Sequence, residues 1–130
     1  MGDPVAKQGD QVVGLDTHIV LIPSPGGPVP TPMPFVFSGG LQDSLSASVS
    51  VDNMSAAVKG SGASNTPSHI PIGGSFQNPP SNHATISSGS GSVFADNKAL
   101  ARANDTAKCC NDPTDQDTGH VVAVGTVFSG

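Results

Sequence analysis

The first regular pattern along the chain is an alternation of apolar and serine side chains between residues 44 and 51. A period of two places the apolar side chains on one face of an extended segment and the hydroxyl groups on the other. The alternation ends at Asp52–Asn53, a pair of residues that favours a tight turn. The pattern therefore predicts a β-strand that runs into a hairpin turn.

A second segment with the same turn pair permits two interpretations. Residues 97–103 have the composition of a helix of about two turns, but Asp96–Asn97 could equally form the turn of a hairpin. An internal repeat decides between them, because residues 48–61 align without a gap with residues 92–105. Since the earlier copy has the period of a strand, the repeat favours a hairpin in the later copy.

The two ends of the chain together resemble a third copy of this unit. Residues 6–10 match residues 57–61 and 101–105, and residues 125–130 resemble the strand that begins at Gly91. Three strand–turn–strand units bury a continuous core only when they assemble around it. The sequence therefore predicts one all-β domain over residues 1–130 with approximate threefold symmetry and a β-prism-like shape.

Each unit is followed by a loop rich in turn-forming residues, at residues 23–40, 72–82 and 111–119. The first loop is dense in proline, which favours an extended polyproline II conformation and is incompatible with a central strand. Phe35 and Phe37 near its end predict that this loop packs onto the body of the protein.

The composition excludes several classes of protein. Only 12% of the residues are charged and 35% are hydrophobic, with 16 Gly, 12 Pro and no Trp or Tyr, which indicates turn-dense β structure rather than disorder. Five Lys and Arg residues and a net charge of −5 argue against a nucleic-acid partner. No secretory signal peptide is predicted, because the first residues form neither a basic region nor an apolar one. No membrane-spanning segment is predicted, since apolar runs such as Ile19–Ile22 are too short to cross a bilayer. We expect synthesis in the cytoplasm and export by another route.

A core with five Phe and scattered aliphatic residues needs an additional source of stability. A disulfide between the adjacent residues Cys109 and Cys110 would be strained, and a cytoplasmic origin disfavours disulfides. A bound metal or a partner subunit is therefore expected to stabilise the fold.

The candidate metal ligands follow the repeat. His18 and His69 each lie eight residues after equivalent positions, and Cys109 and Cys110 follow the third equivalent position by four and five residues. Loops that converge at one end would bring these side chains together, and either His83 or His120 could complete a tetrahedron. Three His and one Cys form a structural zinc shell, with iron as the alternative metal.

Enzymatic readings have less support. A catalytic zinc site commonly uses a Glu as base, but the chain contains no Glu, and it has no Gly-x-Ser-x-Gly motif. Cys110 and His120 could be placed as a nucleophile and its base, without any sign of an oxyanion hole. We expect no enzymatic activity; the alternatives are a metal-stapled adhesin or binding module and a small metal-dependent hydrolase.

Several motifs agree in order with one known family. Gly9–Asp10 and residues 91–105 and 125–128 resemble PAAR repeats: Ala99-Leu100-Ala101-Arg102 stands where the family has Pro-Ala-Ala-Arg, and residues 56–59 are more degenerate. Residues 16–20, 23–32, 65–71 and 110–113 are similar to the PAAR-like subgroup. Over nearly its whole length the chain resembles the spike-tip proteins of type VI secretion and related contractile injection systems.

The resemblance implies a small cone with a metal near its apex, held by His18, His69, His83 and Cys110, with Cys109 and His120 as alternates. It implies that the broad base caps a trimeric β-helical spike, with one tip per trimer, on a particle delivered outside the cell. The tip would aid membrane puncture through transient contact with the target membrane, and it could also attach effectors. Because the chain ends just after the last repeat, it resembles a tip without a C-terminal effector domain.

Overall fold

Strands are the only regular elements longer than a turn within residues 2–130, which are the residues that our computed structural model describes. The predicted all-β class is confirmed, and no helix is present among these residues that could cross a membrane. The strands are β1 (Asp3–Pro4), β2 (Gln11–Ile22), β3 (Val29–Asp43), β4 (Ser50–Val51), β5 (Met54–Ser55), β6 (Gly62–Ser64), β7 (Ser75–Phe76), β8 (His83–Ile86), β9 (Phe94–Ala95), β10 (Lys98–Ala99), β11 (Thr106–Cys109), β12 (Gln116–Val122) and β13 (Phe128–Ser129).

Six strands close into a small barrel in the order β2, β3, β6, β8, β11 and β12, and β12 pairs back onto β2. The short strand β7 joins the outer part of β2. Side chains alternate between the interior and the surface along β2, where Val12, Asp16, His18 and Val20 are buried. Closure leaves no exposed sheet edge along the body of the barrel.

Three two-stranded hairpins lie at one end of this barrel, formed by β4–β5, β9–β10 and β1–β13. The turn residues Asp52, Asn53, Asp96 and Asn97 all have positive φ angles between 50° and 66°, as a type I′ hairpin turn requires. The hairpin interpretation of residues 92–103 is therefore confirmed over the helix. The third hairpin joins the two chain ends, since Asp3 pairs with Ser129 and Pro4 with Phe128.

A ring of three hydrogen bonds joins the three units around a common axis. The amide of Ala6 donates to the carbonyl of Ala101, Ala101 donates to Ala57, and Ala57 donates to Ala6, at 2.9, 3.0 and 3.0 Å. All three alanines are completely buried. The next layer repeats the pattern with Leu41, Ile86 and Val121, each paired with the turn of one unit. The threefold repeat read from the sequence is thus present in the backbone.

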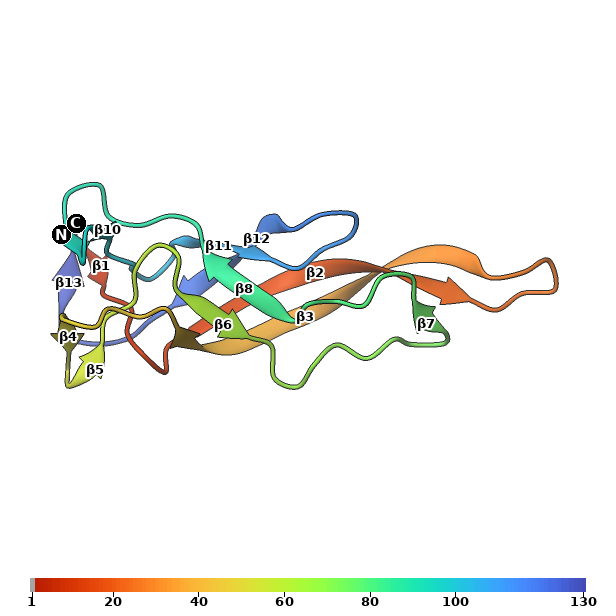
Figure 1. Cartoon of the computed structure of the whole chain (residues 1–130), viewed down its shortest axis with the longest axis horizontal. Coiled ribbons are helices and arrows are strands. Elements are labelled where there is room, and N and C mark those ends of the chain that lie inside the picture. Colours follow the sequence, from red (N-terminus) through yellow and green to blue (C-terminus); the bar gives the residue numbers. More distant parts are fainter. Residues whose placement is uncertain (1) are drawn as a thin grey trace.

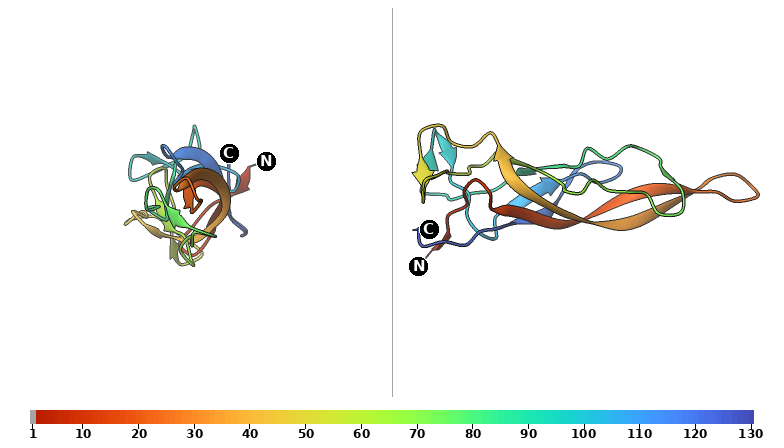
Figure 2. Two further views of the ribbon diagram at one scale, coloured as in Figure 1. Left: turned by 90° about the vertical axis from the view of Figure 1, so that its right-hand side faces the viewer. Right: turned by 90° about the horizontal axis from the view of Figure 1, so that it is seen from below.

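The molecule tapers away from the hairpins. Figure 1 shows the hairpins and both chain ends at the broad end, the barrel in the middle, and the β2–β3 hairpin extending alone to the narrow end. The view along the long axis in Figure 2 shows a compact, roughly round cross-section. The conical shape that the resemblance implied therefore matches the fold.

Several element bounds expected from the sequence are wrong. Of the alternating segment 44–51 only Ser50–Val51 forms a strand, and residues 116–119 of the third predicted loop belong to β12. The first predicted loop is also shorter than expected. Residues 29–40 are part of the long strand β3 rather than a polyproline loop, and Pro30, Pro32 and Pro34 lie opposite Leu21, Ile19 and Thr17 of β2. Proline is accepted in a strand where its missing N–H faces an unpaired edge. The prolines occur at every second position, so all three missing N–H groups fall on the same edge of β3, and no described strand pairs with that edge here. The true turn is confined to the residues between Ile22 and Val29.

The alanine ring predicts a position where a larger side chain is not tolerated. Ala57→Leu adds three carbons where three backbone segments meet. Overpacking of this kind lowers the free energy of unfolding by about 1–3 kcal/mol. We expect a lower urea midpoint for this variant by circular dichroism. The control is Ala47→Leu, which adds the same atoms at an exposed position and should leave the midpoint unchanged. Equal midpoints for the two variants would mean that the axis is not close-packed.

Candidate metal centre

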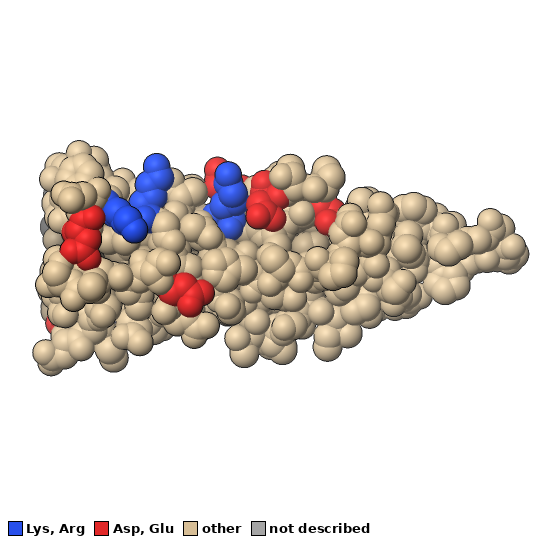
Figure 3. Space-filling view, viewed as in Figure 1, with Lys and Arg blue, Asp and Glu red and all other residues tan. Residues whose placement is uncertain are grey.

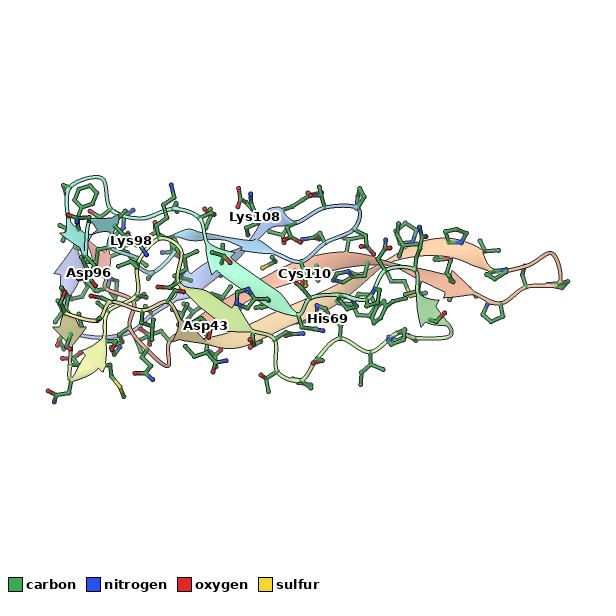
Figure 4. The ribbon with its side chains drawn as sticks, viewed as in Figure 1. Asp43, His69, Asp96, Lys98, Lys108 and Cys110 are labelled. Atoms are coloured by element: carbon green, nitrogen blue, oxygen red, sulfur yellow. The ribbon has the colours of Figure 1, made fainter. Side chains whose placement is uncertain are left out.

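Four buried or nearly buried side chains meet at the narrow end of the barrel. Asp16 and His18 come from β2, His69 from the loop after β6, and Cys110 directly follows β11. One potential ligand atom from each of the four lies within 4.8 Å of those of the other three. Figure 4 shows His69 and Cys110 close together where the barrel narrows and the β2–β3 hairpin extends alone, a region that we call the neck. The group could hold a metal ion.

Strand β2 supplies two of the four side chains because of its period. Asp16 and His18 are two residues apart and therefore project from the same face of the strand. That face points into the barrel, and Asp16 and His18 are 0% and 1% exposed. A carboxylate and an imidazole are thus held side by side in the interior, where polar groups need partners.

Cys110 is positioned by the residues that follow it, because the side chains of Asn111 and Asp112 bind the backbone of β2 where the backbone of β12 no longer does. Beyond the last β12–β2 pair, the amides of Thr17 and Ile19 donate to Asn111 Oδ1 and Asp112 Oδ2 at 2.7 and 2.9 Å. The amide of Asp112 in turn donates to the carbonyl of Thr17 at 2.8 Å. These three bonds fasten the chain after β11 against β2 and bring the Cys110 thiol toward Asp16 and His18.

Two asparagines fix the His69 loop. The amide of His69 donates to Asn82 Oδ1 at 2.8 Å, and Asn65 Nδ2 donates to His69 Nδ1 at 3.1 Å. The Asn65 orientation follows from its other contact, since the Ser38 amide donates to Asn65 Oδ1. His69 therefore carries its proton on Nε2 and donates to Asp16 Oδ2 at 2.8 Å. Coordination through Nε2 would require this proton to move to Nδ1 and the Asn65 amide to turn.

The polar contacts within the group leave two atoms without partners. The Cys110 thiol donates to Asp16 Oδ2 at 3.3 Å and lies 3.6 Å from His18 Nε2. Asp16 Oδ1 and His18 Nδ1 are buried without a hydrogen bond, although Asp112 Oδ2 lies 3.7 Å from the latter. Buried polar atoms normally find partners, and a cation would supply one to the carboxylate. The sulfur, nitrogen and oxygen donors are those that bind zinc and related ions, so the residues fit a metal.

Burial sets the protonation of the two free cysteines and of His18. It raises the pKa of the Cys110 thiol to about 11 and that of Cys109 to about 12. Burial also lowers the pKa of His18, partly offset by Asp112. His18 is therefore the neutral ligand that a metal requires, whereas Cys110 becomes a thiolate only when a cation replaces its proton.

Three of the five phenylalanines surround the imidazoles. The ring centroids of Phe35 and Phe76 lie 5.7 and 5.9 Å from that of His18, and Phe35 and Phe37 lie 5.3 and 6.4 Å from His69. An apolar wall excludes water and strengthens electrostatic contacts inside the site. The imidazole rings of the group are thus packed against aromatic side chains.

The structure brings together three of the four predicted ligands, His18, His69 and Cys110. His83 lies outside the group: its Nε2 is 3.1 Å from Asp43 Oδ2 and its side chain is 41% exposed. The assignment of His83 as a ligand stays a prediction, and the geometry offers Asp16 in its place.

Neither of the two alternates joins the group. His120 is exposed on β12, opposite Thr106 and Val13. Cys109 is buried against Gly119, where an added Cβ would lie 2.6 Å from its sulfur. Asp16 was missed from the sequence, although the Asp-x-His spacing on a strand already places the two side chains on one face.

Comparison with known proteins leaves the assignment to the residues themselves. No protein-family model matches the chain, and no curated protein or solved structure shows significant similarity to it.

Two variants separate the possible fourth ligands. We expect Asp16→Ala to weaken zinc binding by about tenfold or more, because it removes the only carboxylate of the group. His83→Ala should change the affinity less than about twofold, as expected for a group outside the coordination sphere. Zinc titration against a chromophoric chelator measures both. The opposite ranking would establish His83 as the ligand and Asp16 as its neighbour.

The raised thiol pKa predicts a pH dependence of metal binding. Because the pKa of Cys110 is about 11, a metal must displace its proton at any lower pH. The zinc affinity should therefore rise about tenfold per pH unit between about pH 7.5 and about pH 9. In Cys110→Ser, which lacks an ionisable thiol, this slope should fall toward zero. An unchanged slope would mean that Cys110 stays protonated and outside the shell.

Proposed function

We propose that this protein is a non-enzymatic, metal-stabilised tip that caps the trimeric spike of a contractile injection machine. The observation that carries the proposal is that one chain presents three near-equivalent hairpins around one axis at its broad end. A single chain with this internal symmetry can meet three identical chains through three similar contacts. The resemblance to PAAR-repeat proteins supplies the kind of partner, and the threefold axis supplies the expected ratio of one tip per trimer.

Exposed apolar side chains support an interface at the broad end. Val49, Val93 and Val127 occupy equivalent positions just before the first strand of each hairpin, and they are 37%, 39% and 42% exposed. Equivalence follows from the backbone, since their carbonyls accept hydrogen bonds from Ala56, Leu100 and Val5 respectively. Apolar groups repeated in this way suit burial against a symmetric partner.

The narrow end supports a role in crossing a membrane. Two ranges of the chain, residues 17–42 and 60–95, contain no Asp, Glu, Lys or Arg. They include the whole β2–β3 extension and the β7 segment. Figure 3 shows the same contrast, since the tapering narrow part of this face carries no charged side chain. Each charge carried into hydrocarbon costs about 2.5–3.5 kcal/mol or more. An uncharged leading end lowers the cost of a transient passage through lipid.

Zinc is the metal that we propose for the buried group, with iron as the alternative. The donors of Asp16, His18, His69 and Cys110 make up a four-ligand shell, and structural zinc sites are closed in this way. A catalytic zinc keeps an open position for water, so four protein donors favour a structural role over hydrolysis. Bound between β2 and two loops, the ion would join the segments of the neck and resist their separation under load.

The interface predicts which substitutions abolish capping. A variant with Val49→Glu, Val93→Glu and Val127→Glu places three charges on the broad end and should lose binding to the spike trimer of the same organism. Its metal content and melting temperature should stay unchanged, because these side chains are partly exposed already. Native mass spectrometry of the wild-type mixture should show one tip per trimer.

A matched control carries the same charge elsewhere. Leu15→Glu, Val36→Glu and Val122→Glu replace three exposed apolar residues on the flanks and should leave capping intact. Loss of capping in this control alone would move the interface to the flanks. Three tips per trimer would contradict the role of the internal symmetry.

A further inference from the structure

The basic residues of the chain fall into two groups. Lys7 pairs with Asp10 at 3.3 Å, and Arg102 pairs with Asp105 at 2.9 Å. Each of these pairs lies in the turn after the alanine ring, where the carboxylate also accepts a hydrogen bond from the backbone amide of its basic partner. Among residues 2–130 the other three basic side chains form no ion pair: Lys59, Lys98 and Lys108.

All three of these lysines line one groove on the flank of the protein. The groove has a volume of about 910 Å³ and is open to solvent. Its walls are the turn at Lys59–Gly60, the β9–β10 hairpin and the outer faces of β8 and β11. Lys108 lies directly across from Thr85 in the β11–β8 ladder. Figure 4 shows Lys98 near the broad end and Lys108 farther along the barrel.

The groove therefore differs in charge from the rest of the protein. The chain has ten acidic residues and a net charge of −5, yet Asp117 is the one carboxylate among the residues described as lining this groove. Figure 3 shows the basic side chains along one flank of the broad half, with acidic side chains at the two ends of this row. Long-range attraction of an anionic partner is thus directed to this flank, while other parts of the surface repel it.

We propose that this groove binds an extended acidic segment of a partner protein. The ammonium groups come from separate elements along the groove, which suits carboxylates spaced along a chain rather than one compact anion. Phe94, 59% exposed at the groove wall, offers an apolar contact, and Thr85, Ser87 and Asn97 offer polar groups for a peptide backbone. The inference does not depend on the capping role, because it uses different side chains.

A short acidic segment fits these charges better than a nucleic acid does. Nucleic acids carry a dense and continuous line of phosphates, which would extend beyond the groove onto the acidic remainder of the surface. A segment with a few carboxylates contacts the lysines alone. The same reasoning predicts that binding weakens strongly as salt screens the charges.

The test uses a fluorescein-labelled peptide of alternating Asp and Ser, with binding measured by fluorescence anisotropy at low salt. The variant with Lys59→Gln, Lys98→Gln and Lys108→Gln should bind it at least about tenfold more weakly than the wild type. The control carries Gln8→Glu, Gln42→Glu and Gln77→Glu, exposed positions outside the groove. Both variants change the net charge equally, and the control should lose less than about threefold.

Three results would overturn the proposal. Equal binding by the wild type and the lysine variant would remove the groove as the site. An equal loss in the control would reduce the effect to net charge. Tighter binding of a labelled oligothymidylate of the same charge would replace the acidic peptide with a nucleic acid. Spike capping should persist in Lys59→Gln with Lys108→Gln, which leaves the β9–β10 hairpin at the broad end unchanged, so failure here is distinguishable from failure of the proposed function.

Discussion

The hydrogen bonds between Ala6, Ala57 and Ala101 are the constraint on which the architecture depends. Each repeat donates to one neighbour and accepts from the other, so the three units close into a ring without an edge. The approach is possible because alanine side chains leave room for three backbones at one axis. From this ring the hairpins leave in one direction and the barrel strands in the other. The broad end and the tapering body are two consequences of the same contact.

The taper places different physical demands on the two ends. At the broad end the hairpins are short, and their valines remain partly exposed. At the narrow end the β2–β3 hairpin continues beyond the barrel, with prolines on the unpaired edge of β3. An unpaired edge invites association with other strands, and proline removes the N–H groups that would support it. The extension is therefore long, uncharged and blocked along one edge.

The buried polar group links these ends because it lies where the barrel gives way to the extension. Its side chains come from segments far apart in the sequence, and Asn111 and Asp112 replace the lost backbone pairing beside it. Without a cation, an aspartate and a thiol whose pKa is raised share a site enclosed by phenylalanine rings. Burying these polar side chains without enough partners is unfavourable. A bound metal ion would supply a partner and would link β2 to the two other segments that carry the donors. A bound ion would give this small, alanine-rich core the additional stability that its composition calls for.

The local features of the chain were predictable because they depend on neighbours in sequence. The period-two alternation, the Asp-Asn turns and the 44-residue repeat predicted the hairpins, the threefold symmetry and the completion of one unit by the chain ends. The repeat predicted that His18, His69 and one of the two cysteines would meet, and the family resemblance implied Cys110, which is the cysteine found in the group. The proline-rich strand was missed, since proline is tolerated only on an edge without a partner, and strand order is a property of the whole sheet. Asp16 was missed although its spacing puts it on the same face as His18, because spacing in sequence does not reveal that this face points into the barrel at the depth of His69 and Cys110.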